Sequence, residues 1–186
     1  MNPMIHKARG LPALLCLAWL GLLPARTWAD GYDSVQLTIT GTLVSVPCTI
    51  PPADANISLD LGTVVNKDLL RDKRSKPKGF VLHLEECDPS VAKGVKVTFS
   101  GTASSEDKNL LSLAKGSAAA GIALGIVQGK DSPKDLPLGQ ASSKQTLQTG
   151  KNQLDFGVYV ALLKSGEKKL TPGTFSAQST LKLTYE

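Results

Sequence analysis

Residues 35–43 read VQLTITGTL, and in this stretch apolar and polar side chains alternate with a single interruption. Successive side chains of a β-strand point to opposite faces, so the stretch predicts a strand with one apolar row and one polar row. The apolar row consists of Val35, Leu37, Ile39, Gly41 and Leu43. Burying its four apolar side chains would contribute roughly 6–12 kcal/mol before opposing terms, at roughly 1.5–3 kcal/mol each.

Gly41 is the interruption in this apolar row. Glycine weakens a strand interior, and it often marks a point where another backbone approaches closely. A groove that is shallow opposite Gly41 would accept the strand in one register, since a slip by one residue turns the apolar row outward. An ordinary first strand with a bulge at Gly41 accounts for the same pattern. The stretch alone leaves both interpretations open.

The residues before this stretch predict export from the cell. Lys7 and Arg9 precede an uninterrupted apolar run of thirteen residues, Leu11–Leu23, and small residues follow at Thr27 and Ala29. This is the pattern of a signal peptide, residues 1–29, cleaved after Ala29. The run is short for a membrane span, and no second run follows, so we expect no membrane-spanning segment.

The mature chain, residues 30–186, carries 18 basic and 16 acidic side chains, because the three basic residues of the leader leave with it. This near balance gives no reason to expect a nucleic acid partner. Two cysteines remain, Cys48 and Cys87, and an even number in an exported chain predicts a disulfide. A pair of free buried thiols is the alternative, whereas a metal site needs more ligands than these cysteines and one histidine supply.

Alternating stretches continue along the mature chain and predict an all-β fold. The expected strands are 35–46, 57–65, 80–87, 95–99, 122–126, 156–162 and a last strand after Pro172-Gly173. Residues 100–121 are expected to be loop, with one helical turn over 110–113. About seven short strands and one disulfide favour an immunoglobulin-like sandwich, with a jelly roll or a small barrel as the alternative.

The final stretch, residues 174–186, reads TFSAQSTLKLTYE and carries a second apolar row. Its members are Phe175, Ala177, Leu181, Leu183 and Tyr185. No further strand follows to cover this one, and a long apolar edge strand associates with another chain unless something pairs with it. The first strand therefore has an apolar row to bury, and the last strand has an apolar edge that another strand could cover.

Several stretches resemble the subunits of chaperone-usher fimbriae of the type 1 and P-pilus kind. TITGTLVSVPCTI (residues 38–50) is similar to their N-terminal extension, where a glycine lies a few residues before the first cysteine, and FVLHLEEC (80–87) to the stretch before the second. GIALGI (121–126), LDFGVYVALL (154–163) and LTPGTFSAQSTLKLTYE (170–186), with its penultimate tyrosine, are the nearest match. The C-terminal half looks most like a minor, adaptor-type subunit.

This resemblance implies an incomplete immunoglobulin-like sandwich that lacks its final strand and is completed by a donor strand. Residues 30–46 would be the donor-strand extension and residues 47–186 the pilin domain. A periplasmic chaperone would fill the open groove first. The extension of the next pilin subunit would then replace the chaperone strand at an outer-membrane usher. The product would be a head-to-tail fimbrium on the bacterial surface that supports adhesion, since contacts of this kind do not close on themselves.

The resemblance also assigns roles to residues. The row from Val35 to Leu43 would be the donor strand, and the row from Phe175 to Tyr185 would form one wall of the acceptor groove. The carboxylate of Glu186 would be the chaperone anchor, and the disulfide would join Cys48 to Cys87. The chain departs from the family pattern by ending in a glutamate.

The sequence offers no catalytic constellation, so we expect neither an enzyme nor a cofactor. His83 is the only mature histidine, and its place in an alternating stretch favours a surface position. A basic cluster, made of Arg71, Lys73, Arg74, Lys76 and Lys78, is interpreted as a solvated loop or as a contact for an acidic surface. A secreted, free-standing immunoglobulin-like binding module is the alternative function.

Overall fold

The computed structural model describes residues 35–43 and 45–186, and the predicted signal peptide, residues 1–29, lies outside them. The chain divides into two units, residues 1–42 and residues 43–186. All helices and strands of the described residues belong to the second unit.

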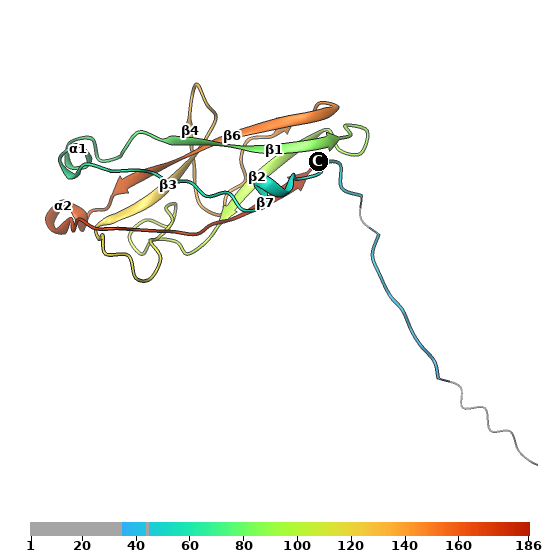
Figure 1. The fold of residues 1–186 in the computed structure, drawn as a ribbon, viewed down its shortest axis with the longest axis horizontal. Coiled ribbons are helices and arrows are strands. Elements are labelled where there is room, and N and C mark those ends of the chain that lie inside the picture. Colours follow the sequence, from blue (N-terminus) through green and yellow to red (C-terminus); the bar gives the residue numbers. More distant parts are fainter. Residues whose placement is uncertain (1–34, 44) are drawn as a thin grey trace, which may run out of the picture. The chain divides into compact units, whose positions relative to one another are not determined.

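Seven strands, two short α-helices and one turn of 3-10 helix make up the described part of the second unit (Figure 1). The elements are η1 (Pro52–Asp54), α1 (Asn66–Asp72), β1 (Lys78–Cys87), β2 (Gly94–Ser100), β3 (Ile122–Gln128), β4 (Lys134–Leu136), β5 (Gln145–Thr146), β6 (Gly150–Leu162), α2 (Gly166–Lys169) and β7 (Thr180–Tyr185). One sheet has four strands in the order β1-β6-β3-β4, and the other has three in the order β5-β2-β7. All five pairings are antiparallel.

Apolar side chains from both sheets meet in a main cluster between them. β2 illustrates the cause: Val95, Val97 and Phe99 are buried, whereas Lys96 and Thr98 between them are only partly covered. The rings of Phe99 and Phe156 join the two sheets edge to face, with their centroids 5.0 Å apart. Two antiparallel sheets around one core form the immunoglobulin-like sandwich that the sequence predicts, so the all-β fold class is confirmed.

β6 lies inside the four-stranded sheet, with β1 on one side and β3 on the other. Its neighbour β3 must carry a glycine at one position. A Cβ atom on Gly125 would lie 2.1 Å from the Tyr159 ring of β6, which is far inside any permitted contact. The absence of a side chain at Gly125 therefore makes room for the Tyr159 ring over the sheet.

The strands expected around Phe80, Val95, Ile122 and Phe156 are confirmed as β1, β2, β3 and β6. The last strand is also present, as β7, but it begins at Thr180, later than the alternation of side chains suggested. The sandwich also contains two short strands, β4 and β5, and two helices, none of which the alternation of side chains predicts.

Three expectations of secondary structure are wrong. Residues 57–65 are not a strand, and neither are residues 35–43 and 45–46, the described parts of the stretch expected to form the first strand. Alternation shows only that a segment is suited to a sheet, whereas a strand also requires a ladder of hydrogen bonds to a neighbour. The helical turn expected over 110–113 is absent, and Leu111 instead exchanges backbone hydrogen bonds of 2.8 and 2.9 Å with Leu124.

Candidate functional site

β7 has a pairing partner on one side only. It pairs with β2 through six residue pairs, from Val95 opposite Tyr185 to Ser100 opposite Thr180. It is the outermost strand of its sheet, and no strand of the described residues pairs with its other edge. The backbone N–H and C=O groups on that edge are therefore available to an added strand.

The side chains of this last segment only partly close the core. Leu181, Leu183 and Tyr185 pack against the main cluster, and Phe175 and Ala177 pack against a second cluster around Leu69, Ile122 and Val160. All five residues of the predicted groove wall are intermediate in exposure, whereas Thr180, Lys182 and Thr184 are exposed. Burial raises the pKa of the Tyr185 hydroxyl. The predicted row faces the core but remains half covered.

Residues 56–64 form a second segment with an unpaired backbone, in a stretch for which the sequence predicted only an ordinary strand. Within the described residues, the N–H groups of 56–64 donate to no backbone carbonyl, and the N–H of Gly62 donates to the Asp60 carboxylate. Leu61 and Val64 of this segment pack against the same cluster as Phe175 and Ala177. Figure 1 shows the segment running along the sandwich to α1. Its signal in the sequence was the alternation in ISLDL, which ends before Gly62.

The residues of the predicted donor row are exposed. The exposed fractions are 91% for Val35, 79% for Leu37, 83% for Ile39 and 100% for Leu43. A Cβ atom on Gly41 would meet no atom within 4 Å. The described residues thus contain one apolar row that is almost uncovered and another that is half covered.

The C-terminal residue is bound to β2. The backbone O of Glu186 accepts hydrogen bonds from the N–H groups of Lys93 and Gly94, at 2.8 and 2.9 Å. Its side-chain carboxylate lies 2.7 Å from the Lys96 ammonium group, and this hydrogen bond lowers the pKa of Glu186. The terminal glutamate therefore has an ionic partner within its own chain.

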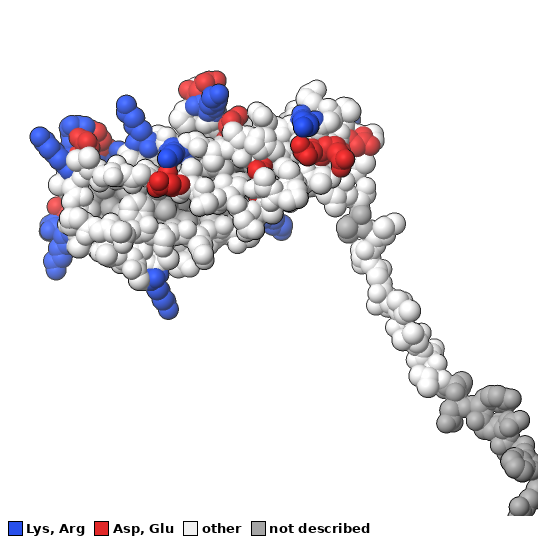
Figure 2. Space-filling view, in the orientation of Figure 1, with Lys and Arg blue, Asp and Glu red and all other residues white. Residues whose placement is uncertain are grey.

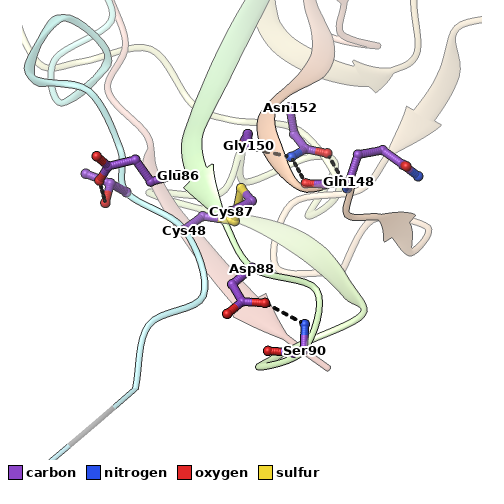
Figure 3. The surroundings of a disulfide bond; sticks show 9 residues. Cys48, Glu86, Cys87, Asp88, Ser90, Gln148, Gly150 and Asn152 are labelled. Carbon is purple, nitrogen blue, oxygen red and sulfur yellow. Dashed lines mark hydrogen bonds between the residues drawn. A yellow bond between two sulfur atoms is a disulfide. The ribbon is translucent and has the colours of Figure 1, made fainter.

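The disulfide joins Cys48 to Cys87, as predicted, and closes a loop across a sequence separation of 39 residues (Figure 3). The alternative of two free thiols is thereby excluded. In the chain-entropy treatment a loop of this length stabilises the fold by roughly 4 kcal/mol. The bond fixes the point where the chain enters the sandwich to the end of β1.

His83 lies at the surface of β1, as the sequence favoured, and it has a definite partner. The carboxylate of Asp54 accepts the backbone N–H of His83 at 2.5 Å and lies 2.8 Å from Nδ1 of its ring. These contacts lower the pKa of Asp54, chiefly through the backbone hydrogen bond. The pair fastens η1 to β1.

The basic cluster is partly neutralised inside the chain. Arg71 contacts Asp68 and Asp72 at 3.1 and 2.7 Å, which raises the pKa of the Arg71 guanidinium. Arg74 bridges to Asp135 at 3.1 Å and lies 4.0 Å over the Tyr159 ring, and Lys73 pairs with Glu167 at 2.9 Å.

Lys76 and Lys78 take part in no ion pair among the described residues. A hollow of about 480 Å³ beside α1 is lined by Leu61, Val64 and Leu69 and by several of these charged side chains. Most of the cluster therefore belongs to local ion pairs and not to one open anion site.

Within the described residues no group of histidine, cysteine and carboxylate side chains has the geometry of a metal site. No helix of this part of the chain combines the length and the apolar character needed to cross a membrane.

The fimbrial protein family matches residues 37–186 of the chain. Fimbria A protein of Serratia marcescens is 33% identical over 151 residues, which cover 81% of this chain and 84% of that protein. The major MR/P fimbria protein of Proteus mirabilis is 31% identical and covers 84% of this chain and 86% of its own length. A solved structure of a chaperone-usher pilus superposes with a TM-score of 0.64 at 26% identity, over 83% of this chain and 96% of that one.

Proposed function

The chain belongs to the fimbrial protein family, as a structural subunit of the chaperone-usher type and not an enzyme, and from this premise we propose that it polymerises by donor-strand exchange. Residues 35–43 of one subunit would add a strand beside β7 of the next. The single observation that carries the proposal is the half-covered row of β7, which has a partner strand on only one side.

The dimensions of the two rows support this pairing. At about 3.4 Å per residue, the donor row from Val35 to Leu43 would span about 27 Å as a strand, whereas β7, Thr180–Tyr185, spans about 17 Å. The donor would therefore pair with β7 and continue past its start, beside Phe175 and Ala177. We expect an antiparallel arrangement, because every strand pair of the sandwich is antiparallel and such pairs are slightly more stable. Val35 would then lie toward Tyr185, and Leu43 toward Phe175.

Added strands of this kind bind through main-chain hydrogen bonds, and their alternate side chains provide the specificity. Before exchange, a periplasmic chaperone would cover the same edge, and an outer-membrane usher would host the replacement. The terminal carboxylate of Glu186 would be the anchor for basic residues of the chaperone. One oxygen of this terminus is bonded to Lys93 and Gly94 within the chain, so the chaperone would have to use its remaining hydrogen-bonding capacity.

The proposal is tested with the mature chain, co-expressed in the periplasm with a matching chaperone and purified as their complex. A fluorescent peptide of residues 34–46 should displace the chaperone and remain bound on a native gel. A Gly41→Leu peptide should fail, because its added side chain faces the shallow point of the groove. The matched control is Thr40→Leu, which adds a similar side chain to the opposite face and should be captured.

The behaviour of the isolated mature chain, without chaperone, can contradict the proposal. If the mature chain without chaperone is a stable monomer that captures no peptide, donor-strand exchange is excluded. The secreted free-standing binding module would then regain support. The comparisons favour the pilus subunit, because the relatives are fimbrial proteins and this chain matches most of their length.

The place of the subunit in the fibre remains a prediction of the sequence resemblance. A minor or adaptor subunit would label a fimbrium at one or a few points when tagged at an exposed loop and stained with gold-coupled antibody. Label along the whole fibre would identify a major rod subunit instead. Loss of binding to host cells on deletion of the gene would test the proposed support of adhesion, with fibre number as the control.

A further inference from the structure

The point where residues 45–47 enter the sandwich is surrounded by carboxylates. The carbonyl oxygen of Pro47 accepts the N–H of Asp88 at 2.8 Å, and Thr49 exchanges backbone hydrogen bonds with Glu85, both of 2.8 Å. The Thr49 hydroxyl donates to the Glu86 carboxylate at 3.2 Å. We call Glu85, Glu86 and Asp88 the root cluster, and Figures 2 and 3 show carboxylates at this end of the molecule. Lys151, 3.3 Å from Glu85, is the ion-pair partner of this cluster within the described residues.

The opposite end of the sandwich is basic. α1 and α2 meet there through the ion pair of Lys73 and Glu167, and Figure 2 shows lysine and arginine side chains gathered at that end. Residues 66–76 and 164–169 contain eight basic and three acidic side chains.

Five lysines of these two segments enter no ion pair within the described part of the chain, and we call them the helix-end lysines. They are Lys67, Lys76, Lys164, Lys168 and Lys169. Two further carboxylates interact with these segments, but they are engaged locally, Asp135 with Arg74 and Glu106 with Ser165.

Chain length limits how far the root cluster can lie from the donor strand. Only residues 44–46 separate Leu43 from Pro47, and four extended steps span at most about 14 Å. Wherever Leu43 is placed on an acceptor, the root cluster of the donor follows within that reach. An antiparallel donor brings Leu43 toward Phe175. This residue follows α2 in the chain by only a few positions.

We propose that the root cluster of one subunit docks on the helix-end lysines of a second copy of this chain, so that opposite charges join successive subunits beside the exchanged strand. The inference rests on the proposed donor-strand exchange and adds to it an ionic contact between the folded bodies. A parallel donor would instead bring the root cluster toward the C-terminal end of the acceptor, where Tyr185 packs in the same cluster as Cys48 and Cys87. The acceptor's own root cluster lies at that end, so like charges would meet, and the charge pattern therefore favours the antiparallel direction.

Opposite charges at such an interface accelerate association more than they tighten it. The test therefore measures the rate at which two subunits join. The acceptor is the chaperone complex of a chain that starts at residue 44 and cannot donate. The donor is the mature chain carrying a second copy of residues 35–45 after Glu186, joined by a short glycine-rich turn, so that its own groove is filled and it can donate but not accept. Each join yields one dimer, which is followed on a native gel.

The variants reverse charge on one partner at a time. Glu85→Lys with Glu86→Lys in the donor, or Lys168→Glu with Lys169→Glu in the acceptor, should each slow joining about tenfold in low salt. Combining the two reversed partners should restore the rate, and 0.5 M salt should remove the differences. The matched control is Lys130→Glu with Lys134→Glu in the acceptor, which makes the same change in net charge near β4 and should leave the rate unchanged.

A peptide of residues 34–46 with blocked ends carries no charged side chain and lacks the root cluster. It should enter all acceptors at one rate, which separates strand exchange from charge docking. If the peptide enters but single reversals do not slow the joining of whole subunits, or the reversed pair shows no rescue, the ionic contact is refuted and donor-strand exchange stands. If the peptide fails to enter the unaltered acceptor, the proposed function itself fails.

Discussion

β6 and β7 look alike in sequence but differ in the structure. Both alternate apolar and polar residues, yet Leu154 and Phe156 of β6 are buried, whereas Leu181 and Leu183 of β7 are half exposed. β6 has a neighbouring strand on each side, and β7 has one only on the side of β2. Alternation therefore predicts which side chains face the core, but the number of neighbouring strands decides how deeply they are buried. The functional proposal depends on that difference.

The largest effect is expected when β7 is given the neighbour that it lacks. A chain that starts at Val46 and carries residues 35–45 after Glu186, joined by a short glycine-rich turn, would place the donor antiparallel to β7. Covering the row should raise the thermal midpoint by about 10–20 °C, as expected for a gain of several kcal/mol in a domain of this size. Calorimetry of the chains with and without the added segment measures the shift.

Two matched double variants of the added segment test which face of it matters. Leu37→Asp with Ile39→Asp should abolish the gain, because these side chains would face the core. Thr38→Asp with Thr40→Asp should retain most of it, because these face away. Equal behaviour of the two variants would contradict the proposed register.

A smaller effect is expected from truncating one leucine in each strand. Leu154→Ala should lower the free energy of unfolding by about 2–5 kcal/mol, the usual range for a buried leucine. Leu183→Ala should lower it by about 1 kcal/mol in the isolated chain, because its side chain is already half solvated. In the chain with the added strand, the cost of Leu183→Ala should approach that of Leu154→Ala. Urea unfolding measures all three, and an equal cost in the isolated chain would show that β7 is already covered.

The smallest effect is expected at the contact between η1 and β1, the strand that pairs with β6. The pKa of Asp54 is lowered by its contacts with His83, so its stabilisation is present above the ordinary aspartate pKa of about 3.9 and is lost as the pH falls through the lowered value. Asp54→Asn should therefore reduce the urea midpoint at pH 6.5, and the deficit should shrink near pH 3. Asp131→Asn is the control, since its carboxylate accepts no hydrogen bond within the described residues. A deficit that grows toward pH 3 would refute the assigned role.

The main features of the fold were predictable from local signals. The alternation around Phe80, Val95, Ile122 and Phe156 identified four strands of the sandwich, and the predicted export signal together with two cysteines predicted the disulfide of Cys48 and Cys87. The roles of the donor and acceptor rows remain predictions, although the structure places Leu181, Leu183 and Tyr185 of the second row on β7, whose other edge has no partner strand among the described residues.

Other features could not be read from the sequence because their partners are far apart in it. The pairs Asp54–His83, Arg74–Asp135 and Lys73–Glu167 join residues separated by 29 to 94 positions. The expected strand over 57–65 has the right pattern but forms no hydrogen-bond ladder with a described strand. Whether an alternating segment pairs depends on the rest of the fold, so its own residues do not reveal it.

The sequence by itself determined which side chains turn inward, because the alternation of a strand is set by the geometry of each residue and its immediate neighbours. It also predicted export of the chain and the disulfide of Cys48 and Cys87, and the structure confirms the disulfide. Only the tertiary structure decided which alternating segments obtained neighbours, and so which apolar row stayed half covered. It also gathered carboxylates at one end and lysines at the other, since burial and surface charge depend on contacts between segments that are distant along the chain.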